Sequence, residues 1–339
     1  MNEKRVDVTV LVPVLDEEHH LRAVIAAMLA QSFGGTAEFL FIDGGSRDRS
    51  GAILREHAEA DPRVRVLHNP TGGIPEALNI GLRAARGRFV ARMDAHAHYP
   101  SGYLQLGIER LERGDVVSVS GPQLAAGDGR WSRRVSLALA SPLGVGGAKF
   151  RRVMSEEIEV DSGFTGMWRR ADLVAHGGWD EAWANDEDLE LAARLREGGG
   201  RIVCLPAMAA SYVPRDSVLA LARQYWRYGF YRVKTSRRHP TSLRPSQLLP
   251  PMLMLTLAGT VGPLRRIARP ALALYGVAVA ASTVTCARRA GLREAAPVPV
   301  VYATMHLAYG SGFLGGCIRW GLPSRALLAV LRSVAGRRG

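Results

Sequence analysis

The order of apolar and polar residues in the first part of the chain predicts alternating strands and helices. Short apolar runs of strand length are each followed by a segment in which apolar residues recur every three or four positions. The predicted strands are Val8–Val12, Phe39–Ile42, Val64–Leu67 and Phe89–Met93. Four such strand–helix alternations predict an α/β fold with a doubly wound, mainly parallel sheet and right-handed crossovers.

Beyond the fourth strand the sequence predicts further helices and strands, with one irregular stretch. The pattern predicts helices at 101–113 and from Asp186 onward, and strands at 115–120, 162–168 and 201–205. Segment 121–159 has no sustained period, so we expect loop and short helix there.

The C-terminal third has a different pattern, in which long windows lack any Asp, Glu, Lys or Arg. These windows are Pro245–Leu264, Pro270–Ala287 and Ala295–Ile318. Each is long enough to cross a hydrocarbon core, although Pro250-Pro251 also suits a re-entrant or interfacial segment. Before them, Ser217–Arg238 has one apolar face flanked by basic residues, which is typical of a helix that lies at a membrane surface.

Basic residues are concentrated in the same third of the chain. From Val213 onward there are 19 Lys and Arg against two acids, whereas the first 212 residues carry 25 basic and 29 acidic side chains. Because this charge flanks windows of membrane-spanning length, it indicates anionic lipid rather than nucleic acid. The three cysteines form no CxxC pair, and the N-terminus has no signal-peptide pattern, so we expect a reducing compartment.

These patterns divide the chain into four regions. We expect a soluble α/β domain over 1–212, a basic amphipathic interface helix over 213–244, two to three membrane segments over 245–320, and a basic tail over 321–339.

An acid followed by two histidines comes directly after the fourth predicted strand. Ligands of α/β sheets bind beyond the carboxyl ends of the strands, so Asp94 and His96 could hold one divalent cation, Mg or Mn. Taken alone, this motif is more typical of a turn capped by Asp94, with His96 and His98 in solvent.

Two further acidic positions bear on that choice. Asp43 ends the second strand, where a carboxylate can accept hydrogen bonds from a base or ribose, and no GxGxxG fingerprint is present. Asp186-Glu187-Asp188 begins a helix, where acids favour the helix dipole. Crowded carboxylates also raise one another's pKa toward the range of a general base.

In their order along the chain, these motifs resemble those of family-2 glycosyltransferases with the GT-A fold, over Val8–His239. The matching motifs are Pro13-Val-Leu-Asp-Glu17, Asp43-Gly-Gly-Ser-Arg-Asp48, Ala77-Leu-Asn79-Ile-Gly81, Asp94-Ala-His96, Glu187-Asp188 and Gln224-Tyr-Trp-Arg227-Tyr228. The chain departs from the family pattern at Gly44, at His96 in the metal motif, and at Tyr228, where synthases have Trp.

The resemblance implies a role for each matched residue. Asp188 would be the catalytic base, and Asp94 and His96 the metal ligands. The donor would contact Pro13, Glu17, Asp43, Asn79, Arg92 and Asp94. The acceptor would contact Gly166, Glu187, Gln224, Arg227 and Tyr228.

The reaction implied is inverting transfer of a sugar from a nucleotide-diphosphate donor, with UDP-glucose expected from the similarity to exopolysaccharide enzymes of the succinoglycan type. The expected acceptor is a polyprenyl-diphosphate-linked glycan at a bacterial plasma membrane, with the catalytic domain in the cytoplasm. Membrane lipids and other polysaccharide-assembly proteins are the further partners expected. Two alternatives stay open: a polyprenyl-phosphate glycosyl synthase, and a non-catalytic, membrane-anchored nucleotide-sugar-binding scaffold.

Overall fold

The chain forms two compact units in the computed structural model, which describes residues 6–151 and 153–335. Unit 1 comprises Met1–Leu124 and Val153–Tyr212, and unit 2 comprises Ala125–Arg152 and Val213–Gly339. The division at Tyr212 coincides with the expected end of the α/β domain. Residues 125–151, which belong to unit 2 with the C-terminal helices, leave the α/β domain at a point not expected from the sequence.

An eight-stranded sheet with the order β3-β2-β1-β4-β9-β6-β10-β8 forms the centre of unit 1. Its strands are β1 (Val8–Val14), β2 (Ala37–Asp43), β3 (Val64–His68), β4 (Phe89–Arg92), β6 (Ser118–Gly121), β8 (Ile158–Glu159), β9 (Phe164–Arg169) and β10 (Ile202–Cys204). Strands β1 to β4 pair in parallel, as do β6 and β10, while β9 runs antiparallel to β4 and β6, and β8 to β10. The predicted mainly parallel sheet is confirmed.

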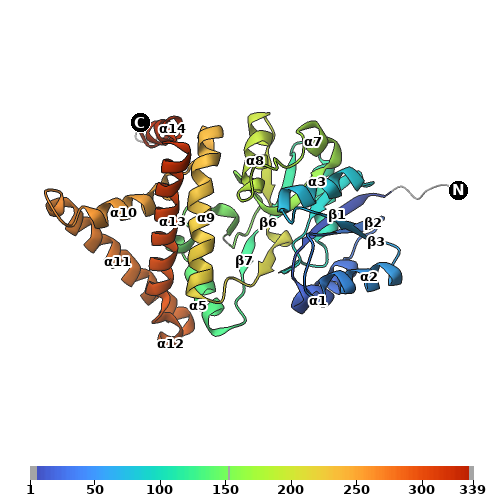
Figure 1. The fold of residues 1–339 in the computed structure, drawn as a ribbon, viewed down its shortest axis with the longest axis horizontal. Helices are drawn as coiled ribbons and strands as arrows, with labels where there is room; N and C mark the ends of the chain where they lie inside the picture. Colours follow the sequence, from blue (N-terminus) through green and yellow to red (C-terminus); the bar gives the residue numbers. More distant parts are fainter. Residues whose placement is uncertain (1–5, 152, 336–339) are drawn as a thin grey trace. The chain divides into compact units, whose positions relative to one another are not determined.

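Helices cover both faces of this sheet (Figure 1). Val10 and Val12 of β1 pack with residues of α1 (Glu18–Leu29), α2 (Ser50–Ala60) and α4 (Tyr103–Glu112). Leu11, which points to the opposite face, packs with residues of α3 (Ile74–Ala84), α7 (Arg170–Ala175) and α8 (Glu187–Glu197). Successive side chains of β1 point to opposite faces of the sheet, and helices cover both faces. Its sequence is therefore mostly apolar instead of alternating between apolar and polar residues.

Strand β1 extends further than the sequence predicted. It continues through Pro13, which pairs with Ile42 of β2, whereas β4 accompanies β1 only as far as Leu11. At Pro13 the strand therefore has a neighbour on one side only, so the missing N–H breaks no ladder.

Short elements complete unit 1. A second sheet has the order β5 (Ala97–His98), β11 (Ala210–Tyr212) and β7 (Gln123–Ala125), and a 3₁₀ turn, η2, spans Pro206–Met208. Because β5 pairs with β11, the chain just after Asp94 is fixed to the segment that ends at Tyr212.

Unit 2 is helical. Its helices are α5 (Arg130–Leu139), α6 (Pro142–Val145), α9 (Val218–Arg238), α10 (Leu249–Ala258), α11 (Arg265–Ala290), α12 (Leu292–Ala295), α13 (Val298–Trp320) and α14 (Ser324–Ala335), with 3₁₀ turns η1 (Lys149–Arg151), η3 (Pro240–Ser242) and η4 (Pro245–Leu248). Ser141, in the segment between α5 and α6, hydrogen-bonds the hydroxyl of Tyr302 in α13 at 2.7 Å. This contact ties residues 125–151 to the C-terminal helices.

Helices α9 and α13 pack closely along their lengths because glycines line the seam. A Cβ added to Gly229 would lie 2.0 Å from the Tyr309 carbonyl oxygen, and one added to Gly312 would lie 2.1 Å from that of Trp226. Leu221 and Val233 of α9 are buried. The amphipathic helix predicted for the membrane surface thus places part of its apolar face against protein.

Helix α11 is the one described helix that is long and apolar enough to cross a membrane, with 26 residues and a mean hydropathy of 1.6 in its best window. The other two apolar windows fall on α10, which has ten residues, and on α13, whose Val301 and Met305 are buried. Two or three spans are expected from the sequence, and the described helices offer one candidate. Residues 336–339 of the expected basic tail lie outside the described residues.

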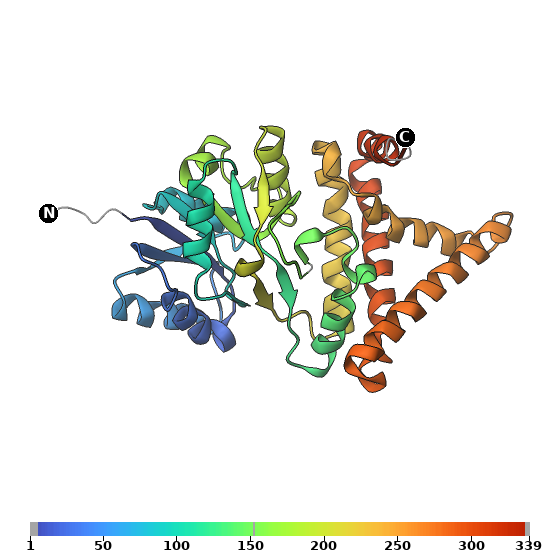
Figure 2. The ribbon, with the colours of Figure 1, turned by 180° about the vertical axis from the view of Figure 1, so that it is seen from behind.

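The two helices α10 and α11 form a hairpin whose connecting turn lies away from α13 (Figures 1 and 2). Leu255, Val261, Leu264 and Leu274 in this hairpin are all more than half exposed. The pair Pro250-Pro251 stands in the first turn of α10, where missing N–H groups break no helical hydrogen bond.

Candidate active site

Arg92, the last residue of β4, lies at the centre of a cluster of carboxylates. Its Nε donates to Asp94 Oδ1 at 3.0 Å, and its Nη1 donates to Glu187 Oε1 at 2.9 Å and to Asp188 Oδ1 at 2.7 Å. The arginine is 5% exposed. The structure therefore brings together the acid predicted to bind metal and the acid predicted to act as base.

The first turn of α8 supplies Glu187 and Asp188. The preceding residue, Asp186, has a positive φ of 66°, a conformation that Asp tolerates better than most residues and that reverses the chain just before the helix. The indole Nε1 of Trp179 donates to Asp188 Oδ1 at 3.3 Å. Within the described residues, Asp188 Oδ2 has no hydrogen-bond partner, so this oxygen is available to a substrate.

The surroundings of Asp188 change its acidity. Burial raises the pKa of the Asp188 carboxyl to about 7, the charges of Glu187 and Asp94 add to the rise, and Arg92 and the Trp179 N–H oppose it. A carboxylate with a pKa near neutrality can both accept a proton from a hydroxyl and release it again.

Glu17 and His96 form a second pair, with 3.0 Å between Glu17 Oε1 and His96 Nδ1. Asp94 Oδ2 has no partner within residues 6–151 and 153–335. No group of three or more His, Cys, Asp and Glu side chains in those residues forms a closed metal site. Asp94 and His96 supply a carboxylate oxygen and an imidazole, ligand types that Mn or Mg accepts, and so could hold such an ion.

The turns after β1 and β2 are joined by hydrogen bonds. Asp16, which has a positive φ of 55°, accepts from the Arg47 N–H at 2.7 Å, and the Glu17 N–H donates to Ser50 Oγ at 2.8 Å. Asp43 Oδ1 accepts from the Ser46 N–H and hydroxyl at 3.0 and 2.7 Å. Pro13 and Asp43, at the ends of β1 and β2, and Glu17, in the turn after β1, thus lie at the carboxyl edge of the sheet.

The departure at Gly44 lies at a tight contact with the loop after β3. A Cβ at this position would lie 3.2 Å from the Cα of Gly72, which itself has a positive φ of 71°. A side chain at Gly44 would therefore require the loop after β3 to shift by a few tenths of an ångström.

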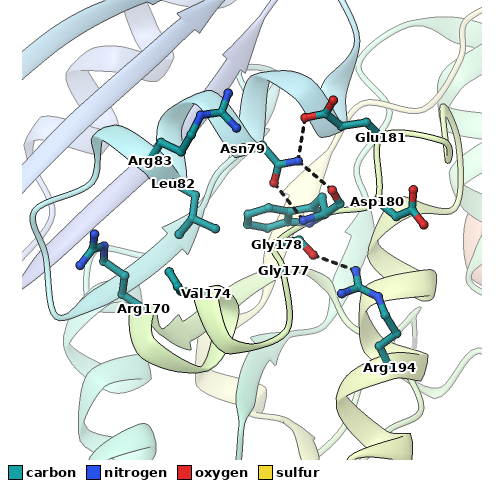
Figure 3. A pocket seen from close by; sticks show the side chains of 11 residues that line it. Asn79, Leu82, Arg83, Arg170, Val174, Gly177, Gly178, Asp180, Glu181 and Arg194 are labelled. Carbon is teal, nitrogen blue, oxygen red and sulfur yellow. Dashed lines mark hydrogen bonds between the residues drawn. The ribbon is translucent and has the colours of Figure 1, made fainter.

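Both atoms of the Asn79 side-chain amide form hydrogen bonds within the protein. Its Nδ2 donates to the Trp179 carbonyl at 2.7 Å and to Glu181 Oε1 at 3.0 Å, and its Oδ1 accepts from the Trp179 N–H at 3.0 Å. Figure 3 shows these bonds in the wall of an open cavity of about 810 Å³, which Arg83 and Arg170 also line. Asn79 thus connects α3 to the loop that carries Trp179.

Gly166 lies directly opposite Arg92 in the β4–β9 pairing. Its φ of 140° follows a positive φ of 51° at Thr165, a strained conformation for a β-branched residue. A Cβ at Gly166 would lie 3.2 Å from the Val119 carbonyl oxygen. This bend places the backbone of β9 beside the carboxylate cluster.

Sequence reasoning missed Trp179 and Tyr99. The Asp94 N–H donates to Tyr99 Oη at 2.8 Å, and burial raises the pKa of the Tyr99 phenol well above its usual range. Trp179 follows the Gly177-Gly178 pair, which marks a turn but not a contact with Asp188. No local pattern indicates either contact.

Gln224, Arg227 and Tyr228 all lie on α9 in unit 2. Gln224 Nε2 donates to Tyr228 Oη at 3.1 Å, one helical turn away. Arg227 lies on the neighbouring face of the helix and lines an apolar groove with Arg223.

A family model and similar proteins of known sequence both match this chain. The family model described as Glycosyl transferase family 2 matches residues 9–175. The chain is 30% identical over 243 residues to the succinoglycan biosynthesis protein ExoA of Rhizobium meliloti (strain 1021), covering 71% of this chain and 73% of that protein. It is 35% identical over 147 residues to the undecaprenyl-phosphate 4-deoxy-4-formamido-L-arabinose transferase of Pseudomonas aeruginosa (strain LESB58), covering 41% of this chain and 43% of that one.

Solved structures share the fold. The mannosyltransferase PcManGT of Pyrobaculum calidifontis, in complex with GDP-Man and Mn²⁺, aligns with a TM-score of 0.58 at 21% identity over 90% of this chain and 88% of its own. TarS 1–349 of S. aureus, in complex with UDP-GlcNAc, aligns with a TM-score of 0.53 at 15% identity over 94% and 93%. At these identities the likeness concerns the fold alone.

Proposed function

Because the chain belongs to glycosyltransferase family 2 and has the GT-A fold, we propose that it is an inverting hexosyltransferase of exopolysaccharide synthesis. It transfers a sugar from a nucleotide-diphosphate donor, with UDP-glucose expected, to a hydroxyl group of a lipid-linked glycan. The observation that carries this proposal is Asp188, with a raised pKa and an Oδ2 that has no partner among the described residues.

The chemistry assigned to Asp188 is general base catalysis. Its Oδ2 takes the proton of the acceptor hydroxyl, whose oxygen attacks the anomeric carbon from the side opposite the diphosphate. The bond from that carbon to the diphosphate oxygen breaks, and its electron pair leaves with the nucleotide diphosphate. Arg92 and Trp179 hold Asp188 Oδ1 and so direct Oδ2 toward the acceptor.

Donor binding is assigned to the joined turns after β1 and β2. Asp43 suits contact with the base or ribose, Pro13 lies near the end of the neighbouring strand β1, and Glu17 lies in the turn that follows it. The relatives of known structure carry GDP-Man and UDP-GlcNAc, so nucleotide and sugar vary between members that share the fold.

A divalent cation would be held by Asp94 and His96, the open donor pair described above. When bound, such a cation neutralises charge that develops on the leaving diphosphate. PcManGT, which shares the fold, is described with Mn²⁺. Glu17 pairs with His96 and would set the orientation of the imidazole.

Membrane attachment is assigned to unit 2, with the catalytic unit in the cytoplasm. Helix α11 has a span of suitable length, with Arg265, Arg266 and Arg269 at its start and Arg288 and Arg289 at its end. Basic residues at both ends of an apolar helix suit the headgroup regions of a bilayer.

The test is Asp188→Asn in the purified full chain, with transfer of labelled glucose from UDP-glucose to extracted lipid-linked glycan as the readout. If Asp188 is the base, kcat falls by about 10²–10⁴-fold, while donor binding by calorimetry is unchanged. Asp180→Asn, in the loop before α8, is the matched control and retains turnover.

The second candidate function, transfer to a polyprenyl phosphate, is favoured by the match to the undecaprenyl-phosphate transferase. A phosphate oxygen is already anionic and needs little base catalysis, so Asp188→Asn would then have a mild effect. Wild-type protein that turns over no donor with either acceptor class and shows no response to Mn²⁺ or Mg²⁺ would favour the non-catalytic scaffold.

A further inference from the structure

An apolar groove of about 500 Å³ lies among α9, α10 and α13 in unit 2. Its lining is mostly apolar, with two basic side chains, Arg223 and Arg227. The other lining residues are Ala222, Trp226, Met254, Leu307, Ala308 and Ser311. This volume is within the range of pockets that bind small ligands.

Three of the residues that line the groove have small side chains. Ala222 of α9 faces it from one side and Ala308 and Ser311 of α13 from the other. The seam beside it is closed, since Gly312 brings the α13 backbone against Trp226 and Gly310 brings it against Pro250. Close backbone contacts thus lie beside the groove, and the small side chains of Ala222, Ala308 and Ser311 leave space within it.

The two arginines are placed for an anion at the groove. Arg223 and Arg227 are one helical turn apart, so they lie on the same face of α9. Both are exposed, and neither has an ion pair or hydrogen bond in the part of the chain that the structure describes. The two acids of the C-terminal third are Asp216 and Glu294, neither of which lines the groove.

We propose that this groove binds the acceptor lipid, with its isoprenoid chain along the apolar walls and its phosphate groups on Arg223 and Arg227. The assignment rests on the proposed function in so far as that function requires a lipid-borne acceptor. The apolar walls select a hydrocarbon chain, and the paired guanidiniums select the adjoining phosphate or diphosphate.

The groove also separates residues that the sequence motif groups together. Arg227 lines it, whereas Gln224 and Tyr228 bond to one another on the neighbouring face. Arg223, which is outside the Gln-x-x-Arg pattern, is on the groove side. The lipid phosphate is therefore assigned to Arg223 together with Arg227.

The test uses farnesyl diphosphate as the probe, with binding to the full chain in neutral detergent measured by isothermal titration calorimetry. The assay contains neither nucleotide sugar nor divalent cation, so its outcome is independent of turnover and of the base assigned above. We expect farnesyl diphosphate to bind. Farnesol lacks the diphosphate and inorganic diphosphate lacks the isoprenoid chain, so both should bind much more weakly.

Variants locate the binding. Arg223→Ala and Arg227→Ala should each weaken farnesyl diphosphate binding by about tenfold, the contribution of one charge-assisted hydrogen bond. Ala308→Phe should abolish binding by filling the groove. Arg238→Ala, an exposed arginine on the same helix outside the groove, should leave the affinity unchanged.

Three results would overturn the assignment. The first is unchanged affinity in both arginine variants, which keep the groove shape and so test it even if Ala308→Phe fails to fold. The second is equal binding of farnesol. The third is equal competition by phosphatidylglycerol, since the groove would then be a general site for anionic lipids.

Discussion

Units 1 and 2 each have arginine at a candidate site, but the arginines differ in burial and in hydrogen bonding. Arg92 is buried and donates to three carboxylates, whereas Arg223 and Arg227 are exposed and have no partner among the described residues. A buried guanidinium whose Nε and Nη1 already bond three carboxylates holds those partners in position, and a ligand that took up these donors would displace them. An exposed, unpaired one can bind a ligand at little cost. The comparison therefore assigns positioning to Arg92, which the sequence motif had grouped with donor contacts, and binding to the arginines of α9.

The largest effect expected from this comparison is on stability. Arg92→Met leaves three carboxylates without their shared donor and should lower the free energy of unfolding by about 3–5 kcal/mol, as for a broken buried ion pair. Arg223→Met makes the same chemical change at an exposed position and should alter it by about 0.5 kcal/mol or less. Chemical denaturation of the full chain in detergent measures both. Equal effects of the two variants would show that the difference in pairing does not matter for the fold.

The second prediction concerns pH and the carboxylate held by Arg92. Asp188 acts only when deprotonated, and its pKa is about 7, so kcat should rise by about tenfold between pH 6 and pH 8. The charge of Glu187 contributes to the raised pKa, so Glu187→Gln should move the acidic limb of the profile to lower pH. Arg92 and Asp94 face the same carboxyl with opposite signs, and both stay unchanged in this variant. A flat profile over this range would argue against Asp188 as the base.

The repeating units of unit 1 could be predicted from sequence because local spacing determines which face of an element is apolar. The short apolar runs of β1 and β2 and the period near 3.6 in α1 and α3 each reflect contacts with neighbouring elements. The insertion of β9 between β4 and β6 joins segments distant along the chain, and no local pattern encodes it.

The candidate site shows the same limit. The residue types at Asp94 and Asp188 point to metal and base chemistry, but Arg92 meets Glu187 across 95 residues of sequence. Composition is equally ambiguous for α13, since apolar residues suit both a membrane span and a helix buried in protein. The burial of Val301 and Met305 by other parts of the protein, which no local pattern encodes, is the observation that bears on the choice.

The third prediction uses salt to separate the two arginine sites. The α9 arginines are exposed, so raising the salt concentration from about 0.05 to 0.5 M should weaken farnesyl diphosphate binding by about fivefold through screening. The Arg92 cluster is buried, and its contribution to stability should change little over the same range. The readouts are calorimetric affinity and denaturation midpoint, the latter taken as the difference between wild type and Arg92→Met. If that difference shrinks as much as the affinity does, the cluster is exposed to solvent in solution.

The smallest effect expected is at the second donor to Asp188. Trp179→Phe removes the indole N–H but keeps an aromatic ring, and the N–H lowers the pKa of Asp188. Its loss should therefore raise that pKa further, shift the acidic limb to higher pH and reduce kcat near neutrality by about threefold, the contribution of one neutral hydrogen bond. Trp183→Phe, in the same loop, is the control, and its pH profile should match that of the wild type. If Trp179→Phe lowers turnover equally at all pH values, the ring supports the fold of the loop and the positioning of Asp188 depends on Arg92 alone.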